Sequence, residues 1–194
     1  MVRVRAIAIV ELICVVVTLV ALAFIAVTWF TRPTLSHPHY CLSNIKQICL
    51  AELIYSGDYD DRFSQAEGWG DRIKEYARTD SIMHDTEGVE ANQYGYAFRE
   101  RAGSAKQSGF QHPESTVLIF DSTLLYKNAH SELWSVPQPG RHRSADGSVA
   151  VDNLAFADGH ARGFSTITPS GPNQVGGLAQ ALAADDMAIR DYKK

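Results

Sequence analysis

The chain has 194 residues, of which 45% are hydrophobic and 21% charged, and its formal net charge is −4. This composition is typical of a modest globular domain with one extra element, and it excludes a disordered chain, a collagen and a disulfide-stapled miniprotein. The acidic pI near 5.9 argues against a nucleic-acid-binding surface, which requires clustered Lys and Arg side chains.

The N-terminal segment is the most apolar part of the chain. Between Ala6 and Phe30 the one charged side chain is Glu11, whereas charges occur throughout the residues that follow. As a helix this segment would span about 37 Å, enough to cross a hydrocarbon core of roughly 30 Å. Arg3 and Arg5 precede it, so the positive-inside rule predicts a cytoplasmic N-terminus. The pattern therefore predicts a single-pass transmembrane helix with the remainder of the chain exported.

A secretory signal peptide is the alternative interpretation of this segment, because basic residues precede the small-residue sequence Ala21-Leu22-Ala23. Glu11 favours the anchor, since a signal peptide rarely carries an acidic residue. A carboxylate within lipid costs roughly 2.5–3.5 kcal/mol, so one that is retained usually has a partner or a function. The simpler alternative is that Glu11 reaches the cytoplasmic face of the bilayer.

The sequence from Arg5 to Leu12, RAIAIVEL, resembles the cleavage and methylation segment of type IV prepilins and type II secretion pseudopilins. In that family a peptidase cuts after a small residue, usually Gly, and the fifth residue of the mature chain is Glu. The resemblance implies cleavage between Ala6 and Ile7, which places Glu11 fifth and lets it pair with the new amino group of a neighbouring subunit. Ala6 and Ile7 depart from the usual Gly and Phe or Met.

A second helix is predicted beyond the apolar segment. Pro33 and Pro38 interrupt any continuous helix, because proline lacks an amide donor and crowds the preceding turn. From Cys41 to Gly57, apolar residues recur at spacings of three, four and four, which is typical of a helix with one buried face. These residues are Leu42, Ile45, Cys49 and Leu53.

The same segment, CLSNIKQICLAELIY from Cys41 followed by the loop DYDDRF, resembles the second signature of these pilin-like proteins. In many of them a later Cys-Pro supplies the disulfide partner of the first Cys, but the corresponding stretch here reads Ile-Met-His-Asp and ends at Asp85. Cys41 and Cys49 are about 12 Å apart along one helix, too far for a disulfide. We therefore expect no intrachain disulfide.

Three acidic residues after this helix, Asp58, Asp60 and Asp61, are weak calcium candidates. An EF-hand loop would require an oxygen ligand at the position of Arg62 and a glycine at that of Phe63, so that motif is absent. The pattern favours a solvated loop, with a non-EF calcium site as the alternative. We expect no other cofactor.

The remainder has the pattern of a small mixed domain. Residues 69–77 have helical apolar spacing, and strand-like runs follow at residues 94–98, 116–121 and 153–165. Asp158-Gly159 interrupts the last run, and this pair favours a tight β-hairpin turn.

The same run resembles the C-terminal signature of the pilin-like group, in which a His precedes Phe-Ala-Asp-Gly-His by some ten residues. Here His160 closes that motif and His142 supplies the upstream His, although the spacing is longer. A metal or catalytic cluster of His142, Asp158 and His160 is the alternative. However, a basic loop accounts for His142, a turn accounts for Asp158, and the exposed start of a strand accounts for His160. No hydrolase or nucleotide-binding motif occurs, so we expect no enzyme activity.

The predicted fold is α+β and pilin-like, with a long N-terminal transmembrane helix followed by a small head that contains a short antiparallel sheet. The expected segments are a leader, a transmembrane and assembly helix, a periplasmic stalk helix, the head, and a tail that is either a short helix or frayed, at residues 1–6, 7–30, 31–57, 58–168 and 169–194.

The resemblance implies a structural subunit of a type II secretion or type IV pilus-like filament, held in the bacterial inner membrane with a periplasmic head. The expected partners are a prepilin peptidase, other pilin-like subunits through the N-terminal helix, and the lipid bilayer, with no nucleic acid. The alternatives are a membrane-tethered extracytoplasmic binding or metal-dependent domain that does not polymerise, and a freely secreted protein that begins near Phe24.

Overall fold

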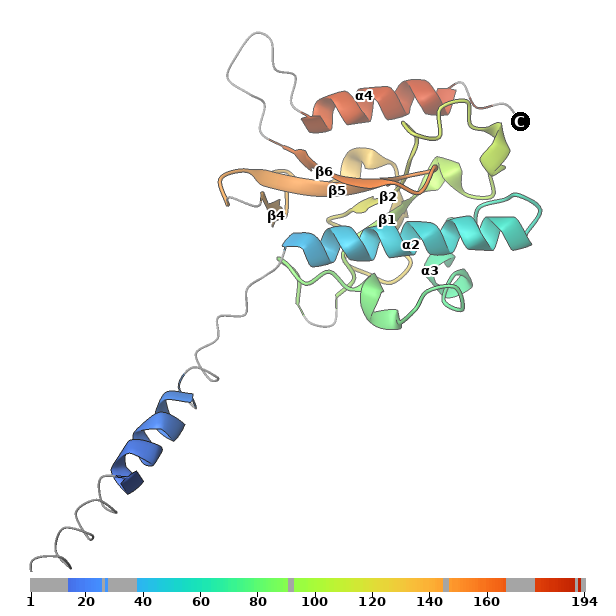
Figure 1. Cartoon of the computed structure of the whole chain (residues 1–194). Helices are drawn as coiled ribbons and strands as arrows, with labels where there is room; N and C mark the ends of the chain where they lie inside the picture. Colours follow the sequence, from blue (N-terminus) through green and yellow to red (C-terminus); the bar gives the residue numbers. More distant parts are fainter. Residues whose placement is uncertain are drawn as a thin grey trace, which may run out of the picture. The chain divides into compact units, whose positions relative to one another are not determined.

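The computed structural model describes residues 14–25, 27, 38–90, 93–144, 147–166, 177–190 and 192. The chain divides into two compact units, Met1–Leu35 and Ser36–Lys194. In the first unit, residues 14–25 and 27 are helical (Figure 1).

The predicted transmembrane helix over residues 7–30 is wrong. Within the described residues, no helix combines the length and the apolar character needed to cross a membrane. The predicted fold with a long N-terminal transmembrane helix is corrected accordingly, and so is the single-pass inner-membrane localisation that depended on it.

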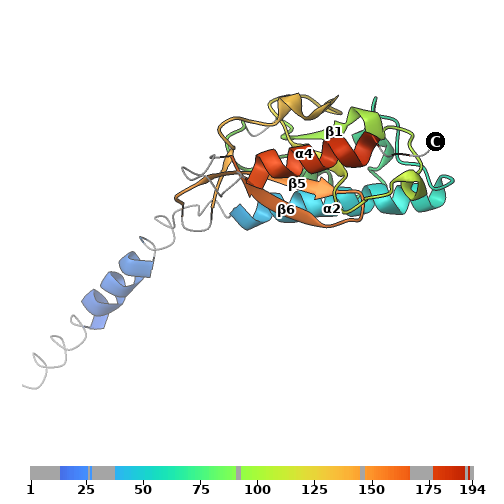
Figure 2. The same ribbon diagram turned by 90° about the horizontal axis from the view of Figure 1, so that it is seen from above.

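The second unit has three layers, with helix α2 (Pro38–Asp58) on one face of a sheet and helix α4 (Gly177–Arg190) on the other (Figures 1 and 2). Side chains of the sheet alternate between the two layers. Tyr96 and Phe98 pack in the cluster that contains the α2 residues, whereas Ala97 and Phe120 pack in the cluster that contains the α4 residues. The core is therefore divided by the sheet.

The sheet has six strands, which are β1 (Tyr96–Arg99), β2 (Val117–Asp121), β3 (His130–Ser131), β4 (His142–Arg143), β5 (Ala150–Phe156) and β6 (Ala161–Ser165). The short helical elements α3 (Trp69–Arg72) and η1 (Asp80–Met83) lie between α2 and β1, and η2 (Glu100–Ala102), η3 (Gln107–Gly109) and η4 (Leu133–Ser135) lie between strands. The strand order is β3-β1-β2-β5-β4, and β6 also pairs with β5. The pairing of β1 with β3 is parallel, so the sheet is mixed rather than antiparallel as predicted.

Two strands share one edge of β5. Strand β2 pairs with the second half of β5, where Val117 lies opposite Phe156, and strand β4 pairs with its first half, where His142 lies opposite Val151. The other edge of β5 pairs with β6 along its length. Strands β2 and β4 therefore lie one after the other along the same edge of β5. The end of β2, at Asp121, is thus next to the start of β4, at His142.

Helix α2 presents one buried face to the sheet. The side chains of Cys41, Ile45, Ile48 and Cys49 are completely buried, at spacings of four, three and one that fit a single helical face. The helix begins at Pro38, a position at which the missing amide of proline removes no helical hydrogen bond.

Two further segments differ in detail from the expectations, and a third contains one of the two structures expected of it. The helix expected at residues 69–77 is limited to α3, Trp69–Arg72. The expected hairpin consists of β5 and β6, but four residues connect the strands and only Gly159 among them has a positive φ, of 90°. The C-terminal region contains α4, whose buried Asp185 accepts a hydrogen bond from the Val117 amide of β2 at 2.7 Å.

Candidate functional site

Four polar side chains from four segments meet inside the second unit. Cys41 comes from the first turn of α2, Asp85 follows η1, Asp121 ends β2 and His142 begins β4. Their exposed fractions are 0%, 5%, 0% and 1% respectively. Burial of so many polar groups is unfavourable unless they satisfy one another. We call Cys41, Asp85, Asp121 and His142 the polar cluster.

The imidazole of His142 is surrounded by carboxylates. Its Nε2 lies 2.9 Å from Asp121 Oδ2 and 3.4 Å from Asp85 Oδ2, and its Nδ1 lies 3.0 Å from Glu87 Oε2. The Nε2 contacts are electrostatic, since this atom has no well-aligned hydrogen bond to any described residue. Burial opposes the charged imidazolium, but the carboxylates of Asp121 and Asp85 hold the pKa of His142 well above its usual range.

Asp85 connects the cluster to α2 and to β4. Its Oδ1 accepts a hydrogen bond from the Cys41 thiol at 2.9 Å and another from the Glu87 amide at 3.1 Å. Its Oδ2 accepts a hydrogen bond from Nη1 of Arg141 at 2.8 Å. Burial opposes ionisation here too, but the neighbouring His142 holds the pKa of this carboxyl well below its usual range.

Two further carboxylates add negative charge. Asp121 Oδ2 accepts a hydrogen bond from the Asn153 amide at 2.6 Å, and Asp152 Oδ1 accepts one from the Arg141 amide at 3.1 Å. The second oxygens, Asp121 Oδ1 and Asp152 Oδ2, are buried and have no hydrogen-bond partner among the described residues. Burial raises the pKa of Asp121, and burial together with the Asp121 charge raises the pKa of Asp152 to about 7.

Acidic groups outnumber basic ones in this region. Among the described residues, the ion pairs and hydrogen bonds of four carboxylates, those of Asp85, Asp121, Asp152 and Glu87, involve two basic residues, Arg141 and His142. Even with a protonated imidazole, full ionisation would leave an excess of negative charge, and a buried excess charge is strongly unfavourable. The region therefore favours a bound cation or protonated carboxyls.

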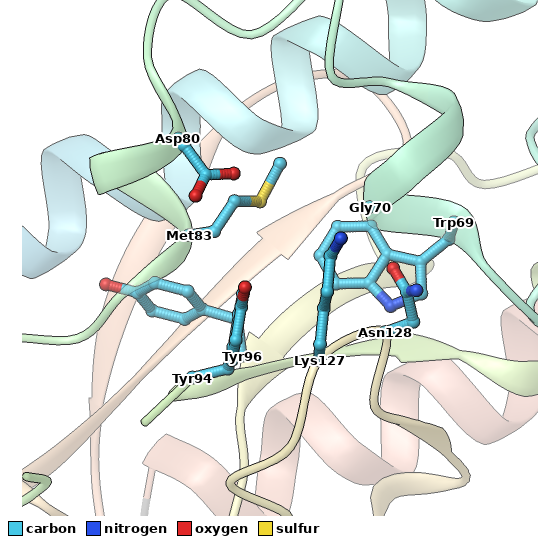
Figure 3. Close-up of a pocket in the computed structure, with 8 residues that line it drawn as sticks. All are labelled: Trp69, Gly70, Asp80, Met83, Tyr94, Tyr96, Lys127 and Asn128. Atoms are coloured by element: carbon cyan, nitrogen blue, oxygen red, sulfur yellow. The ribbon is translucent and has the colours of Figure 1, made fainter. Parts of the chain in front are cut away.

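Tyr96 borders both the cluster and a small cavity. Burial and then the charges of Asp85 and Asp121 raise the pKa of the Tyr96 hydroxyl well above its usual value. The cavity has a volume of about 10 Å³, barely the size of one water, and is therefore no site for a larger ligand. Figure 3 shows its lining residues, which are Trp69, Gly70, Asp80, Met83, Tyr94, Tyr96, Lys127 and Asn128.

The residues predicted for processing and assembly, Ala6, Ile7 and Glu11, lie outside the described residues. The histidines of the C-terminal signature are separated from each other. His142 lies opposite Val151 near the start of β5, whereas His160 follows the far end of that strand, where its Nδ1 lies 2.6 Å from Asp158 Oδ1. Asp158 and His160 therefore take no part in the polar cluster.

The calcium candidates do not converge either. The carboxylate of Asp58 accepts a hydrogen bond from the Tyr76 hydroxyl at 3.0 Å, and that of Asp61 accepts one from the Ser108 amide at 3.0 Å. Asp60 and Asp61 have positive φ angles of 53° and 62°, as expected of a turn. Across the part of the chain that the structure describes, the one group of at least three metal-ligating residue types is Cys41, Asp85 and His142.

No family model, curated protein or solved structure matches the chain. What the polar cluster can bind therefore follows from its own geometry alone.

Sequence reasoning identified Cys41 and His142 but missed Asp85 and Asp121. A signal for Asp121 was present, because it directly follows the apolar run Val-Leu-Ile-Phe and so enters the core with its strand. Asp85 has no comparable local pattern. It lies in the stretch where the pilin-like resemblance places a second Cys, and its carboxylate contacts the Cys41 thiol there.

Proposed function

We propose that the chain is a pilin-like structural subunit that polymerises through its N-terminal helix, with Glu11 setting the register between neighbouring copies. The observation that supports this is the surface of the first unit. From Val15 to Val27, the large apolar side chains that the structure describes are between 51% and 70% exposed. A helix that is apolar on all sides is stable only when other apolar groups cover it.

A second copy of the same helix is a suitable cover. The sequence from Leu12 to Thr31 contains no charged residue, so identical helices can approach without charge repulsion. Each Val, Leu or Phe side chain transferred from water into such a contact contributes about 1.5–3 kcal/mol. Several such residues per helix would offset the entropy lost on association.

Glu11 would select one register from the many that an apolar helix allows. A carboxylate enclosed by apolar helices is unfavourable unless a cation pairs with it. Cleavage between Ala6 and Ile7 would create an amino group four residues before Glu11, and the amino group of one copy can pair with the Glu11 carboxylate of the next. Other registers would leave both charges unpaired.

Cys14 allows a direct test of this assembly. It is exposed on the described helix, whereas Cys41 and Cys49 are buried in the second unit. The full chain would be produced in bacterial cells that contain a prepilin peptidase and treated with thiol-specific bifunctional cross-linkers of graded length. We expect a ladder of cross-linked multimers for the natural sequence and none for Cys14→Ser.

The register is tested by Glu11→Ala in the same assay, which should reduce the cross-linked multimers at least tenfold. Glu67→Gln is the matched control, because it removes one acidic charge at an exposed position of the second unit. Intact-mass analysis should give a mature N-terminus at Ile7. Monomers alone from the natural sequence, or equal cross-linking of Glu11→Ala, would overturn the proposal, as would a mature chain beginning at Met1 or Phe24.

A further inference from the structure

Three of the four donor groups of the polar cluster, those of Cys41, Asp85 and His142, are close enough to share one metal ion. One ligand atom each of Cys41, Asp85 and His142 lies within 4.8 Å of the other two. Zinc binds thiolate at about 2.3 Å and imidazole nitrogen or carboxylate oxygen at about 2.0–2.2 Å. Donors around one tetrahedral ion are therefore less than about 4.5 Å apart. The three groups meet this requirement with small movements of their side chains.

Glu87 provides an independent indication of a ligand. Its carboxylate lies 3.0 Å from Nδ1 of His142, so Nδ1 carries the hydrogen and Nε2 faces Asp85 and Asp121. Histidines that bind metals usually donate their other ring hydrogen to a carboxylate in this way, which fixes the ring and increases its basicity. The His142 side chain is 2% exposed, and its Nε2 has no hydrogen bond to a described residue.

Asp121 lies outside this group of three but beside His142, and with a movement of its side chain it can supply the fourth ligand. Its Oδ2 lies 2.9 Å from His142 Nε2, and its buried Oδ1 lacks a partner among the described residues. Arg141 already binds Asp85 Oδ2, which leaves Asp85 Oδ1, the oxygen nearest to the Cys41 sulfur, for the metal. A divalent ion and Arg141 would neutralise the thiolate and the two aspartates.

We propose that Cys41, Asp85, Asp121 and His142 form a closed, structural site for one divalent transition metal ion, with zinc as the preferred ion. Imidazole, thiolate and carboxylate ligands together suit zinc, whereas calcium and magnesium require oxygen ligands. All four protein ligands are buried, so no coordination position faces solvent and the ion stabilises the fold. The ion would connect the start of α2 to the end of β2 and the start of β4. This site is independent of whether the chain polymerises.

Cobalt(II) is the spectroscopic probe for this site, because a thiolate ligand produces an intense charge-transfer band in the near ultraviolet. The purified full chain, first treated with a chelator, would be titrated with cobalt(II) and then with zinc. We expect the band to saturate at one equivalent per chain and to disappear when zinc displaces cobalt. Elemental analysis should give one equivalent of zinc, and zinc should raise the unfolding temperature.

Cys41→Ser should abolish the charge-transfer band, and Cys49→Ser is its matched control. Cys49 lies two turns further along α2, is equally buried, and donates its thiol hydrogen to the Phe156 carbonyl at 3.1 Å. The Cys49→Ser protein should retain the band. Circular dichroism and the unfolding temperature in chelator report whether each variant is folded before metal is added.

Glu87→Gln tests metal binding in a variant that keeps all four proposed ligands. It preserves an acceptor for His142 Nδ1 but removes the negative charge, and substitutions of this kind weaken metal binding by roughly 10–100-fold. We expect at least a tenfold weaker zinc affinity with an unchanged band shape. The absence of a thiolate band in folded natural protein, or its persistence in Cys41→Ser, would overturn the proposal.

Discussion

The thiol of Cys41 donates a hydrogen bond to Asp85 at 2.9 Å, although the two residues are 44 positions apart in the sequence. The pilin-like resemblance places a disulfide-forming Cys in the segment that contains Asp85. In this chain all three cysteines are free, and a buried carboxylate contacts Cys41 instead. The start of α2 therefore contacts the segment after η1 through polar contacts of the Cys41 sulfur with Asp85 and Thr86 rather than through a covalent bond.

Asp85→Ala should destabilise the second unit by about 3–5 kcal/mol, because it removes the carboxylate paired with the buried Arg141 guanidinium and leaves it only neutral acceptors, the Gly95 and Ser122 carbonyls. Urea denaturation in the presence of a chelator measures this without a contribution from bound metal. Asp80→Ala is the control, since the Asp80 side chain is 56% exposed and its nearest basic atom, in His84, is 4.0 Å away. Its effect should remain below about 1 kcal/mol, and an equal effect of both substitutions would contradict the prediction.

The buried Glu52 should make stability depend on pH. Burial raises the pKa of Glu52 to about 7 from 4.5, although the Ser64 hydroxyl donates to it at 2.6 Å. Between these pH values the folded state holds a proton that the unfolded state has released, so the free energy of unfolding falls as pH rises. Full ionisation of Glu52 in the folded state would cost about 3 kcal/mol.

Glu52→Gln should flatten this decline, as measured by urea denaturation at a series of pH values between about 3.5 and 8, which extends about one unit beyond the window on each side. Asp152 and Asp185, with pKa values raised to about 7 and about 6, contribute a decline of their own that the substitution leaves in place. The exposed Glu67→Gln is the control. If Glu52→Gln and Glu67→Gln show the same pH dependence, the Glu52 carboxyl is not protonated in the folded state.

Gly140→Ala should weaken the attachment of β4 to β5. A Cβ atom at Gly140 would lie 2.6–2.8 Å from backbone atoms of Val151, so the two segments would have to separate. We expect a loss of about 1–3 kcal/mol in the free energy of unfolding. At Gly57, near the end of α2, a Cβ atom would meet nothing within 4 Å, and Gly57→Ala should stabilise by about 0.5 kcal/mol. If alanine changed the free energy of unfolding equally at Gly140 and Gly57, the close approach of Gly140 to the Val151 backbone would be contradicted.

Asp185→Ala should release α4 from the sheet. The Asp185 carboxylate lies 2.8 Å from the Arg99 guanidinium and accepts a hydrogen bond from the Val117 amide at 2.7 Å, and both groups would lose this partner. Glu132 also contacts Arg99, at 3.0 Å, and would retain part of the pairing. We expect a loss of about 3 kcal/mol, together with faster hydrogen exchange of the Val117 amide.

Gln180→Ala provides the comparison on the same helix, because Gln180 is exposed and alanine is the stronger helix former. Its effect should remain within about 0.5 kcal/mol, and the Val117 amide should keep its protection. Unchanged exchange at Val117 in Asp185→Ala would show that other contacts suffice to hold α4.

The elements that were predictable from sequence are those with a local pattern. The repeat of Ile45 and Cys49 at helical spacing appears as α2, and the apolar run before Asp121 appears as β2. The N-terminal prediction is wrong, since no helix among the described residues is long and apolar enough to cross a membrane, and apolar composition alone does not determine helix length. The two-residue strands β3 and β4 were missed, since they are too short to have a period.

The sequence alone determined the elements that have a clear local period, such as α2, β2 and the hairpin of β5 and β6, because a period of 3.6 or 2 residues depends only on neighbours along the chain. Only the tertiary structure decided that Asp121 and Asp85 surround His142. That arrangement arises because β4 continues along the edge of β5 that β2 leaves, and because α2 lies across the sheet with Cys41 in its first turn. Strand order and burial depend on contacts between distant segments, and the spacing of residues does not encode them.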